Sequence, residues 1–150
     1  MSSDRFTVKF AVDLIIRRGN EVLLSLRENT GWMDGRYHFV SGHVDGNEAP
    51  EEAIAREAME EAGIVVDPKN LKLVFVTHRR NGDVSDEYVT LYFEATEWIG
   101  DIENREPEKS GGLDWFNIDT LPENIVPYVE DVLTDYAAGK NYFSIEGPDA

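Results

Sequence analysis

The sequence has no cysteine among its 150 residues. Disulfide frameworks and thiol chemistry are therefore excluded, because both need a cysteine side chain. Long apolar runs are also missing, since no stretch approaches the roughly 20 residues that a membrane-spanning helix needs. The first ten residues, MSSDRFTVKF, lack the basic start and apolar run of a signal peptide. We expect a cytoplasmic protein without a membrane partner.

Basic residues are scarce, with 14 Lys and Arg against 30 Asp and Glu, which gives a formal charge of −16. This field repels polyanions, so non-specific nucleic-acid binding is not expected. A small nucleotide remains a possible ligand because a bound metal ion inverts the local sign of the charge. The content of 41% hydrophobic and 11% aromatic residues is that of a globular chain. We expect one domain over residues 1–150, with a core at about 8–139 and a tail at 140–150.

Alternation of apolar and polar residues predicts β-strands in the first third of the chain. The longest such stretch is residues 7–17, whose strongly apolar face consists of Val8, Phe10, Val12, Leu14 and Ile16. The opposite face carries Lys9, Ala11, Asp13, Ile15 and Arg17. The next elements predicted are a turn at 18–20, a strand at 21–27, a surface loop at 28–35 and a short strand at 36–40.

The residue pattern in the second half of the chain predicts further strands and one helix. Its expected elements are strands at 71–79 and 87–98 joined by a polar turn, a charged loop at 100–112, a short strand at 113–116 and a helix at 125–138. The tail is expected to be partly ordered through Tyr142, Phe143 and Ile145. Together with a helix in the middle of the chain, these elements indicate a mixed sheet covered on both faces, an α/β/α sandwich whose strand order stays open.

The middle helix is predicted to begin at Pro50 and to end at Gly63. Proline suits the first helical position, and glycine suits a left-handed C-terminal residue. Ala49 then occupies the N-cap, where it has no side-chain oxygen to accept an amide hydrogen bond. A narrow stripe of small and apolar residues, Ile54, Ala55, Ala58 and Ala62, predicts a close approach of this helix to the sheet.

Three glutamates, Glu57, Glu60 and Glu61, fall on one face of this helix because residues three and four apart are neighbours. Each like-charge pair costs an isolated helix roughly 0.2–0.5 kcal/mol. Arg56 is expected to reach Glu60 and Glu52, which leaves the other two glutamates of the trio without a cation. Crowded carboxylates with no sulfur ligand nearby suit a hard divalent ion, Mg²⁺ or Mn²⁺, rather than zinc. The alternative is a solvated acidic face.

The segment from Gly42 to Ile64 resembles the Nudix box, in which glycine, glutamate, a central Arg-Glu and a Glu-Glu pair recur at fixed spacing. All of its fixed positions are filled, by Gly42, Glu48, Arg56, Glu57, Ala58, Glu60, Glu61, Gly63 and Ile64. The resemblance, which extends over about residues 8–139, implies a Nudix-type α/β/α sandwich with a mixed sheet. It also implies hydrolysis of a phosphoanhydride bond.

The resemblance implies that the three glutamates and the carbonyl oxygen of Gly42 hold the divalent ions. It also implies that Glu48 and Arg56 do not bind the ions themselves but position the glutamates. The resemblance does not fix the general base. Glu60 or Glu61 could serve, and so could Glu106 or Glu108 of the charged loop, whose alternative role is solubility.

Three residues outside the box are candidates for substrate contact by the same resemblance. Arg27 lies where related hydrolases bind phosphate, and the alternative is an edge-strand arginine in solvent. His38 lies where related oxidised-purine hydrolases contact the base, and the alternative is a strand histidine bonded to its neighbours. Trp32 could stack on a base, or it could cover the edge of the core.

Features outside the box bear on the substrate. The proline of ADP-ribose hydrolases and the tyrosine of dinucleoside polyphosphate hydrolases are absent, since Arg80, Asn81 and Gly82 stand there. Residues 113–116 and 121–127 resemble the oxidised-purine nucleoside triphosphate hydrolases, but Val126 replaces the tryptophan that clamps the base in that group. Ser41 also replaces a common glycine.

These features favour a Mg²⁺-dependent hydrolase that converts a nucleoside triphosphate to a monophosphate and pyrophosphate. Alternatives are hydrolysis of diphosphate derivatives, such as nucleotide sugars or ADP-ribose, and nucleotide sensing without cleavage. The intact glutamate trio counts against sensing. The partner expected is a small nucleotide, and the chain is expected to be a monomer or a homodimer.

Overall fold

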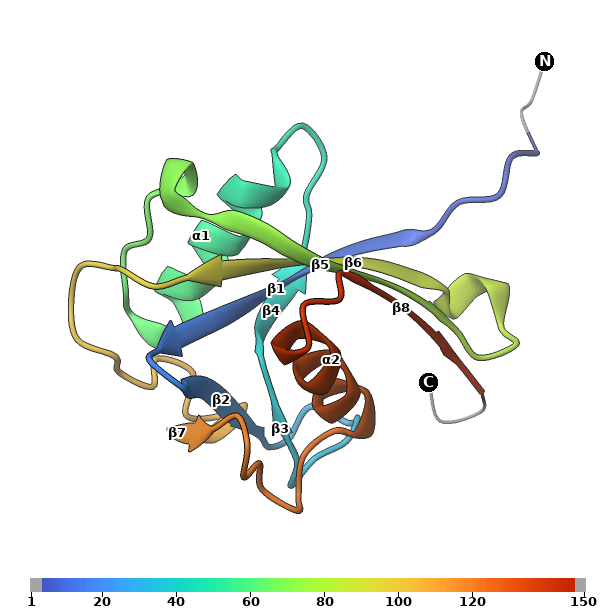
Figure 1. Ribbon diagram of the computed structural model, residues 1–150. Helices are drawn as coiled ribbons and strands as arrows, with labels where there is room; N and C mark the ends of the chain where they lie inside the picture. The colour runs from blue at the N-terminus through green and yellow to red at the C-terminus, as the bar shows by residue number, and fades with distance from the viewer. Residues whose placement is uncertain (1–3, 148–150) are drawn as a thin grey trace.

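A computed structural model describes residues 4–147 of the chain. It contains a mixed sheet in the order β3-β2-β1-β6-β5-β8, with β4 beside β1 and β7 beside β2 (Figure 1). The strands are β1 (Lys9–Arg18), β2 (Glu21–Arg27), β3 (Tyr37–His38), β4 (Val40–His43), β5 (Lys72–Arg80), β6 (Tyr88–Ala95), β7 (Ser110–Asn117) and β8 (Tyr142–Glu146). The helices are α1 (Pro50–Ala62) and α2 (Pro127–Ala137), with short 3₁₀ turns at Pro68–Asn70 and Val84–Asp86.

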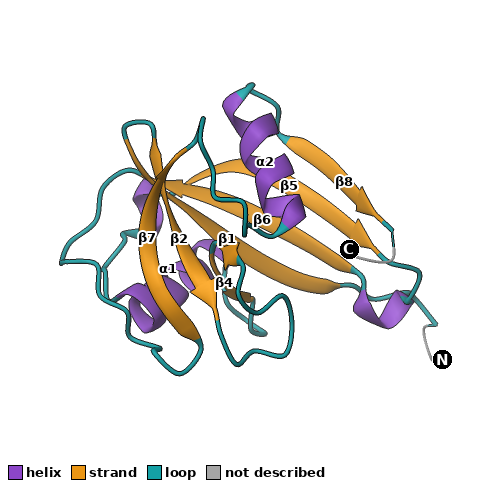
Figure 2. Cartoon of the chain, turned by 90° about the horizontal axis from the view of Figure 1, so that it is seen from below, coloured by secondary structure: helices purple, strands orange, loops and turns teal. Residues whose placement is uncertain are grey.

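The two helices lie on opposite faces of the sheet, as the α/β/α prediction requires (Figures 1 and 2). Val12, Leu14 and Ile16 of β1 belong to the core that α1 covers. Ile15, the residue between two of them, belongs to the core that α2 covers. The side chains of a strand alternate between its faces, so the two cores flank the sheet. The predicted sandwich with a mixed sheet is confirmed.

The face of the first strand opposite the predicted apolar one is buried in the middle of the strand. Asp13 is 3% exposed and Ile15 is 0% exposed, whereas Val8 and Phe10 of the predicted apolar face are 37% and 38% exposed. β1 lies between β4 and β6 over residues 11–14, and α2 covers its second face. Lys9 and Phe10 at the start of the strand pair with β6 but lie beyond the residues that pair with β4. An aspartate therefore sits in the interior of the molecule.

The C-terminal part is more regular than predicted. β7 begins at Ser110, because the end of the charged loop pairs with Arg27 of β2. α2 begins at Pro127, two residues later than expected, since Ile125 forms a bridge with Tyr37. The tail forms β8 parallel to β5, so the sheet extends to Glu146; residues 148–150 lie outside the described part. Among residues 4–147, no helix is long and apolar enough to span a bilayer.

The first turn of α1 lacks a side-chain cap. Ala49 is the N-cap and accepts no side-chain hydrogen bond, although Glu52 accepts one from the Ala49 amide at 3.2 Å. We expect Ala49→Ser to raise the free energy of unfolding by about 0.5–2 kcal/mol, because serine can accept from an unpaired amide of the first turn. Urea unfolding measures this directly. The control is Ala55→Ser inside the helix, which should lower stability. An unchanged midpoint for Ala49→Ser would contradict this helix start.

Candidate active site

Two adjoining cavities lie along β4. The first, which we call the acidic cavity, has a volume of about 620 Å³ and extends between β4, α1 and the loop before β7. The second, which we call the aromatic cavity, has a volume of about 350 Å³ and lies on the α2 side of the sheet. Both are lined by Arg27, His38, Ser41, Gly42 and His43. A ligand larger than one cavity can therefore extend across Ser41 and Gly42 into the other.

The acidic cavity brings together four of the predicted site residues, Glu57, Glu60, Glu61 and Glu106. The Glu61 carboxylate accepts a hydrogen bond from the Ser41 amide at 3.1 Å. Burial raises the pKa of Glu61 well above its ordinary value, and the charge of Glu57 raises it further. Burial, followed by the charge of Glu60, also raises the pKa of Glu57. The like-charge repulsion predicted from helical spacing is therefore present.

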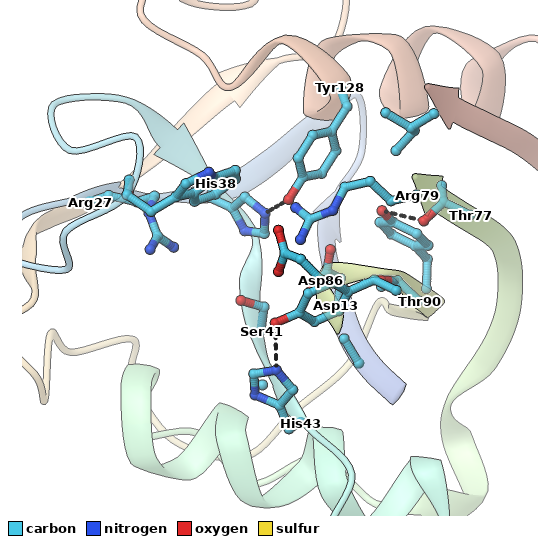
Figure 3. A pocket seen from close by; sticks show the side chains of 16 residues that line it. Asp13, Arg27, His38, Ser41, His43, Thr77, Arg79, Asp86, Thr90 and Tyr128 are labelled. Carbon is cyan, nitrogen blue, oxygen red and sulfur yellow. Dashed lines mark hydrogen bonds between the residues drawn. The ribbon is translucent and has the colours of Figure 1, made fainter. Parts of the chain in front are cut away.

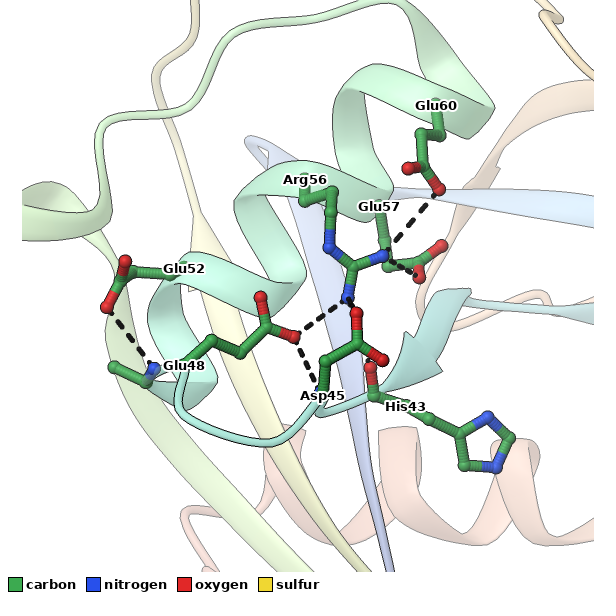
Figure 4. A network of polar contacts seen from close by, with 8 residues as sticks. His43, Asp45, Glu48, Glu52, Arg56, Glu57 and Glu60 are labelled. Atoms are coloured by element: carbon green, nitrogen blue, oxygen red, sulfur yellow. Dashed lines mark hydrogen bonds and ion pairs between the residues drawn. The ribbon is translucent and has the colours of Figure 1, made fainter.

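Arg56 binds a different set of carboxylates from the predicted one (Figure 4). Its guanidinium donates to Glu57 at 2.8 Å and to Glu48 at 2.9 Å, and lies 3.8 Å from Glu60. The expected pairing with Glu52 was wrong, because that carboxylate accepts from the Ala49 amide instead. The expectation that Glu57 has no cation was also wrong, because Arg56 donates to its carboxylate.

Arg56 also connects α1 to the loop that follows β4. It donates to the His43 carbonyl at 3.2 Å and lies 3.4 Å from the Asp45 carboxylate. Glu48 accepts from the Asp45 amide at 2.7 Å, and its hydrogen bond to Arg56 lowers the pKa of the Glu48 carboxyl. The predicted supporting pair is therefore in contact and fixes the loop next to Gly42.

The loop before β7 carries Glu106 to the acidic cavity. The Glu106 carbonyl accepts from the amides of Lys109 and Ser110, each at 2.9 Å, and its own amide donates to the Asn104 side chain at 3.1 Å. Lys109 lines the same cavity, whereas Glu108 is exposed and is not a lining residue. Of the two glutamates that the sequence offered in this loop, the structure brings Glu106 to the site.

His38 is buried and lines both cavities, and both of its ring nitrogens have partners; Figure 3 shows the bond to Tyr128. Nδ1 lies 3.1 Å from the Phe39 carbonyl oxygen, which can only accept, so Nδ1 carries the proton. Nε2 therefore accepts from the Tyr128 hydroxyl at 2.7 Å. Burial lowers the pKa of His38 to about 4. This geometry favours the alternative of a strand histidine that positions its neighbours.

Arg27 and Trp32 form one packed unit at the boundary of the cavities. The guanidinium donates from Nε to the Trp32 carbonyl and from one terminal nitrogen to the Thr30 hydroxyl, both at 2.8 Å. It also lies 4.8 Å from the centroid of the Trp32 ring. The ring of Trp32 is tilted against that of Tyr128 at 6.1 Å between centroids. Arg27 is thus held by the loop and lines both cavities, while Trp32 covers the aromatic one.

Sequence reasoning missed two charged residues in the aromatic cavity, Asp13 and Arg79. Burial raises the pKa of Asp13 to about 8, although Arg79, Arg27 and a hydrogen bond from Tyr92 each act to lower it. The Arg79 guanidinium lies 4.4 Å from the Tyr88 ring centroid, and its buried Nε has no hydrogen-bond partner among residues 4–147. Ile15 and Ala11 on the same strand face could have indicated that Asp13 is buried.

Comparison with known proteins agrees with the box and the fold. The family model for the NUDIX domain matches residues 7–136. The chain belongs to the Nudix hydrolase family. This Nudix hydrolase is 35% identical over 104 residues to an 8-oxo-dGTP diphosphatase of Proteus vulgaris, covering 69% of this chain and 88% of the relative. It is 29% identical to an ADP-ribose pyrophosphatase of Methanocaldococcus jannaschii, covering 87% of this chain and 74% of the relative.

Solved structures show the same fold. A MutT NUDIX hydrolase from Burkholderia pseudomallei superposes on this Nudix hydrolase with a TM-score of 0.77 and 25% identity, covering 85% of this chain and 97% of the other. A MutT protein from Bacillus halodurans gives a TM-score of 0.75 at 23% identity, with coverage of 95% and 92%. The predicted family and fold are thus confirmed together.

The acidic cavity of this Nudix hydrolase fits a hard divalent cation by its donor chemistry. Its ligands are oxygens, and the raised pKa values of Glu57 and Glu61 show that the positive charge nearby does not compensate for burial. Within residues 4–147, no three acidic or histidine side chains are already gathered at metal-binding distance. Arg56 holds Glu57 instead. Binding of a cation would therefore require rotation of these side chains.

Gly42 gives the Glu57 carboxylate room against the backbone. A Cβ atom added at Gly42 would lie 2.3 Å from the Glu57 carboxyl carbon. We expect Gly42→Ala to displace this flexible side chain, and so to lower kcat about tenfold or more while changing the melting temperature little, because a misplaced site group costs rate.

The matched control for this prediction is Gly46→Ala in the same loop, because no atom lies within 4 Å of a Cβ added at Gly46. Steady-state kinetics and thermal unfolding on both variants make the comparison. Equal kcat values for the two variants would contradict the proposed close approach at Gly42.

Proposed function

We propose that this Nudix hydrolase is Mg²⁺-dependent, with Mn²⁺ as an alternative ion, and that it cleaves a nucleoside triphosphate to a nucleoside monophosphate and pyrophosphate. One observation carries the proposal: the acidic cavity adjoins the aromatic cavity across Ser41 and Gly42. A polyphosphate beside the glutamates would leave its base among aromatic side chains. A nucleotide has these two chemically different ends.

The residues that would hold the divalent ions are Glu57, Glu60, Glu61 and the carbonyl oxygen of Gly42. A bound divalent ion neutralises phosphate charge and acidifies water. Arg56 and Glu48 would hold α1 and the loop after β4 in place when the glutamate side chains rotate to bind the cation, because they already join the two segments. Their role is to position the glutamates, since Arg56 contacts carboxylates and a carbonyl.

Two basic residues of the acidic cavity other than Arg56, namely Arg27 and Lys109, would bind phosphate oxygens. Arg27 lies at the boundary of the two cavities, so it suits the phosphates nearest the nucleoside. The proton of the attacking water would pass to a carboxylate in the same cavity. Glu60, Glu61 and Glu106 all line it, and each meets the requirement that a general base lie near the reacting water.

The comparisons support a nucleotide substrate and retain the alternative. The Proteus vulgaris relative is named for 8-oxo-dGTP, a triphosphate, whereas the Methanocaldococcus jannaschii relative is named for ADP-ribose, a diphosphate derivative. Hydrolysis of such diphosphate derivatives is therefore the second candidate function.

A panel of nucleotides tests the proposal. Deoxynucleoside and nucleoside triphosphates, ADP-ribose and nucleotide sugars are incubated with the protein, with and without Mg²⁺. Pyrophosphate release is measured for the triphosphates, and phosphate is measured after phosphatase treatment for the diphosphate derivatives, because their cleavage yields two phosphomonoesters. We expect Mg²⁺-dependent release of pyrophosphate from triphosphates. Products detected only from the diphosphate derivatives would support the second candidate, and no Mg²⁺-dependent product from any compound would contradict both.

A further inference from the structure

The aromatic cavity holds a buried acid, Asp13, and a half-buried arginine, Arg79, that line the same space. Asp13 is 3% exposed, and the Nε atom of Arg79 is buried without a hydrogen-bond partner among the described residues. We propose that these two side chains select a guanine-type base, an inference that rests on the proposed function and names the substrate class of the same site. Figure 3 shows both side chains inside the cavity, between β1, β5 and α2.

Several of the other polar groups around them already have partners. Tyr128 donates to His38, and the hydroxyls of Thr77 and Tyr92 are 3.2 Å apart. Asp86 at the mouth of the cavity accepts from the Asn81 side chain at 2.8 Å and lies 3.5 Å from the Lys9 amine. Asp13 and Arg79 therefore have the greatest unused capacity to bind a polar ligand.

The cavity has the size and walls for a flat heteroaromatic ring. Its volume of about 350 Å³ lies at the lower end of the range of small-molecule pockets, roughly 300–1,000 Å³. The rings of Trp32, Tyr88 and Tyr128 line it, and each lies within 6 Å of the Arg79 guanidinium, at 5.6, 4.4 and 5.7 Å. Aromatic and guanidinium planes both stack on bases.

The hydrogen-bonding edge of guanine matches this pair of charges. Guanine presents the O6 acceptor next to two donors, N1–H and the N2 amino group. A carboxylate can accept from both donors, and a guanidinium can donate to O6. The two donors favour the ionised form of Asp13, as Arg79 also does. Oxidation of guanine at C8 leaves this edge unchanged, so the inference covers both forms.

Other bases offer the ionised Asp13 carboxylate one donor where guanine offers two. Adenine and cytosine place a ring nitrogen acceptor beside their amino group, so an acceptor would face one carboxylate oxygen. Thymine and uracil have a single N–H between two carbonyls. Because unpaired buried polar groups reject a ligand strongly, these bases should bind less well than guanine.

An exchange of specificity tests the inference. Asp13→Asn replaces one acceptor oxygen with an amide donor, which suits xanthine, where a carbonyl replaces the amino group of guanine. We expect wild-type kcat/KM with Mg²⁺ to be about 10- to 100-fold higher for dGTP than for dATP or dXTP. In Asp13→Asn, dXTP should exceed dGTP. A wild-type protein without guanine preference, or a variant that keeps the wild-type order, would overturn the inference.

Binding of monophosphates separates this inference from the proposed function. Calorimetry with GMP, AMP and XMP needs neither Mg²⁺ nor turnover. A wild-type protein that hydrolyses no triphosphate but binds GMP best, with XMP best for Asp13→Asn, would contradict the proposed function and support the inference. A protein that hydrolyses triphosphates but binds GMP, AMP and XMP equally well would support the proposed function and contradict the inference.

Two further variants complete the test. Arg79→Gln should lower kcat/KM for dGTP about tenfold or more, because it removes the donor to O6. Asp86→Asn makes the same change of charge as Asp13→Asn at the mouth of the cavity and should leave the order of base preference unchanged. If Asp86→Asn reversed the order as Asp13→Asn does, net charge rather than edge recognition would set the preference, and the inference would be overturned.

Discussion

We expect kcat to fall about 100-fold or more in each of the variants Glu57→Gln, Glu60→Gln and Glu61→Gln. Each change removes the negative charge of a carboxylate that would bind the cation or accept the proton of the attacking water. The same changes should not lower stability in the absence of metal. The pKa values of Glu57 and Glu61 are raised, so the folded state already disfavours their charged forms. Kinetics with Mg²⁺ and thermal unfolding without it measure the two effects.

The matched control is Glu51→Gln on the same helix, since Glu51 is not among the residues lining the acidic cavity. It should retain wild-type kcat. Loss of activity together with a large fall in melting temperature would indicate a structural role for the trio. Retained activity in all three variants would contradict the assignment of the site.

Asp13→Asn should stabilise the protein increasingly as the pH rises from 6.5 to about 8. The pKa of Asp13 is raised from 3.8 to about 8, so between these values the folded state keeps a proton that the unfolded state has lost. Wild-type stability from this group is therefore present at low pH and is lost as the pH rises through the folded pKa. Asparagine does not titrate, so the variant avoids the loss.

The difference in free energy between variant and wild type should grow by up to about 1.4 kcal/mol per pH unit and then level off above pH 8. His38, whose pKa is lowered from 6.5 to about 4, is present in both proteins, so its contribution cancels in this difference. The raised pKa of Glu57 is common to both proteins and cancels. Urea unfolding at several pH values without metal gives the curves, and parallel curves would contradict a buried, uncompensated Asp13.

The Nudix box could be placed from the sequence because its constraints are local. Pro50 and Gly63 mark the ends of α1, and helical spacing alone puts Glu57, Glu60 and Glu61 on one face. The partners of Arg56 could not be predicted in this way. Its guanidinium reaches Asp45 and Glu48 in the preceding loop, and the path of that loop depends on the pairing of β4 with β1.

The aromatic cavity was harder to predict because it depends on tertiary packing. Alternation assigned Asp13 to a polar face, and only the packing of α2 shows that this face is interior. Arg79 stands at the end of a predicted strand, where an arginine is usually solvated. Its contacts with Trp32 and Tyr128 join segments that are distant in sequence. No local pattern encodes such a contact.

The order of the strands in the sheet could not be predicted from local sequence patterns either. β1 pairs with β6 in parallel, although some 70 residues separate them, and this pairing places Asp13 opposite Tyr92. The tail was expected to be partly ordered through Tyr142, Phe143 and Ile145, and these residues lie in β8 beside β5. Apolar content indicated burial there, but only the exposed edge of β5 explains why the tail forms a strand.

The proposed activity depends on a divalent cation bound among the glutamates of α1. Crystals soaked with Mn²⁺ and a non-hydrolysable nucleoside triphosphate analogue, with anomalous scattering recorded at the manganese edge, test this most directly. We predict manganese bound by Glu57, Glu60, Glu61 and the Gly42 carbonyl, in contact with the phosphates, and the base in the aromatic cavity. Manganese bound elsewhere, with the three carboxylates still facing Arg56 and solvent and the phosphates remote from them, would contradict the account.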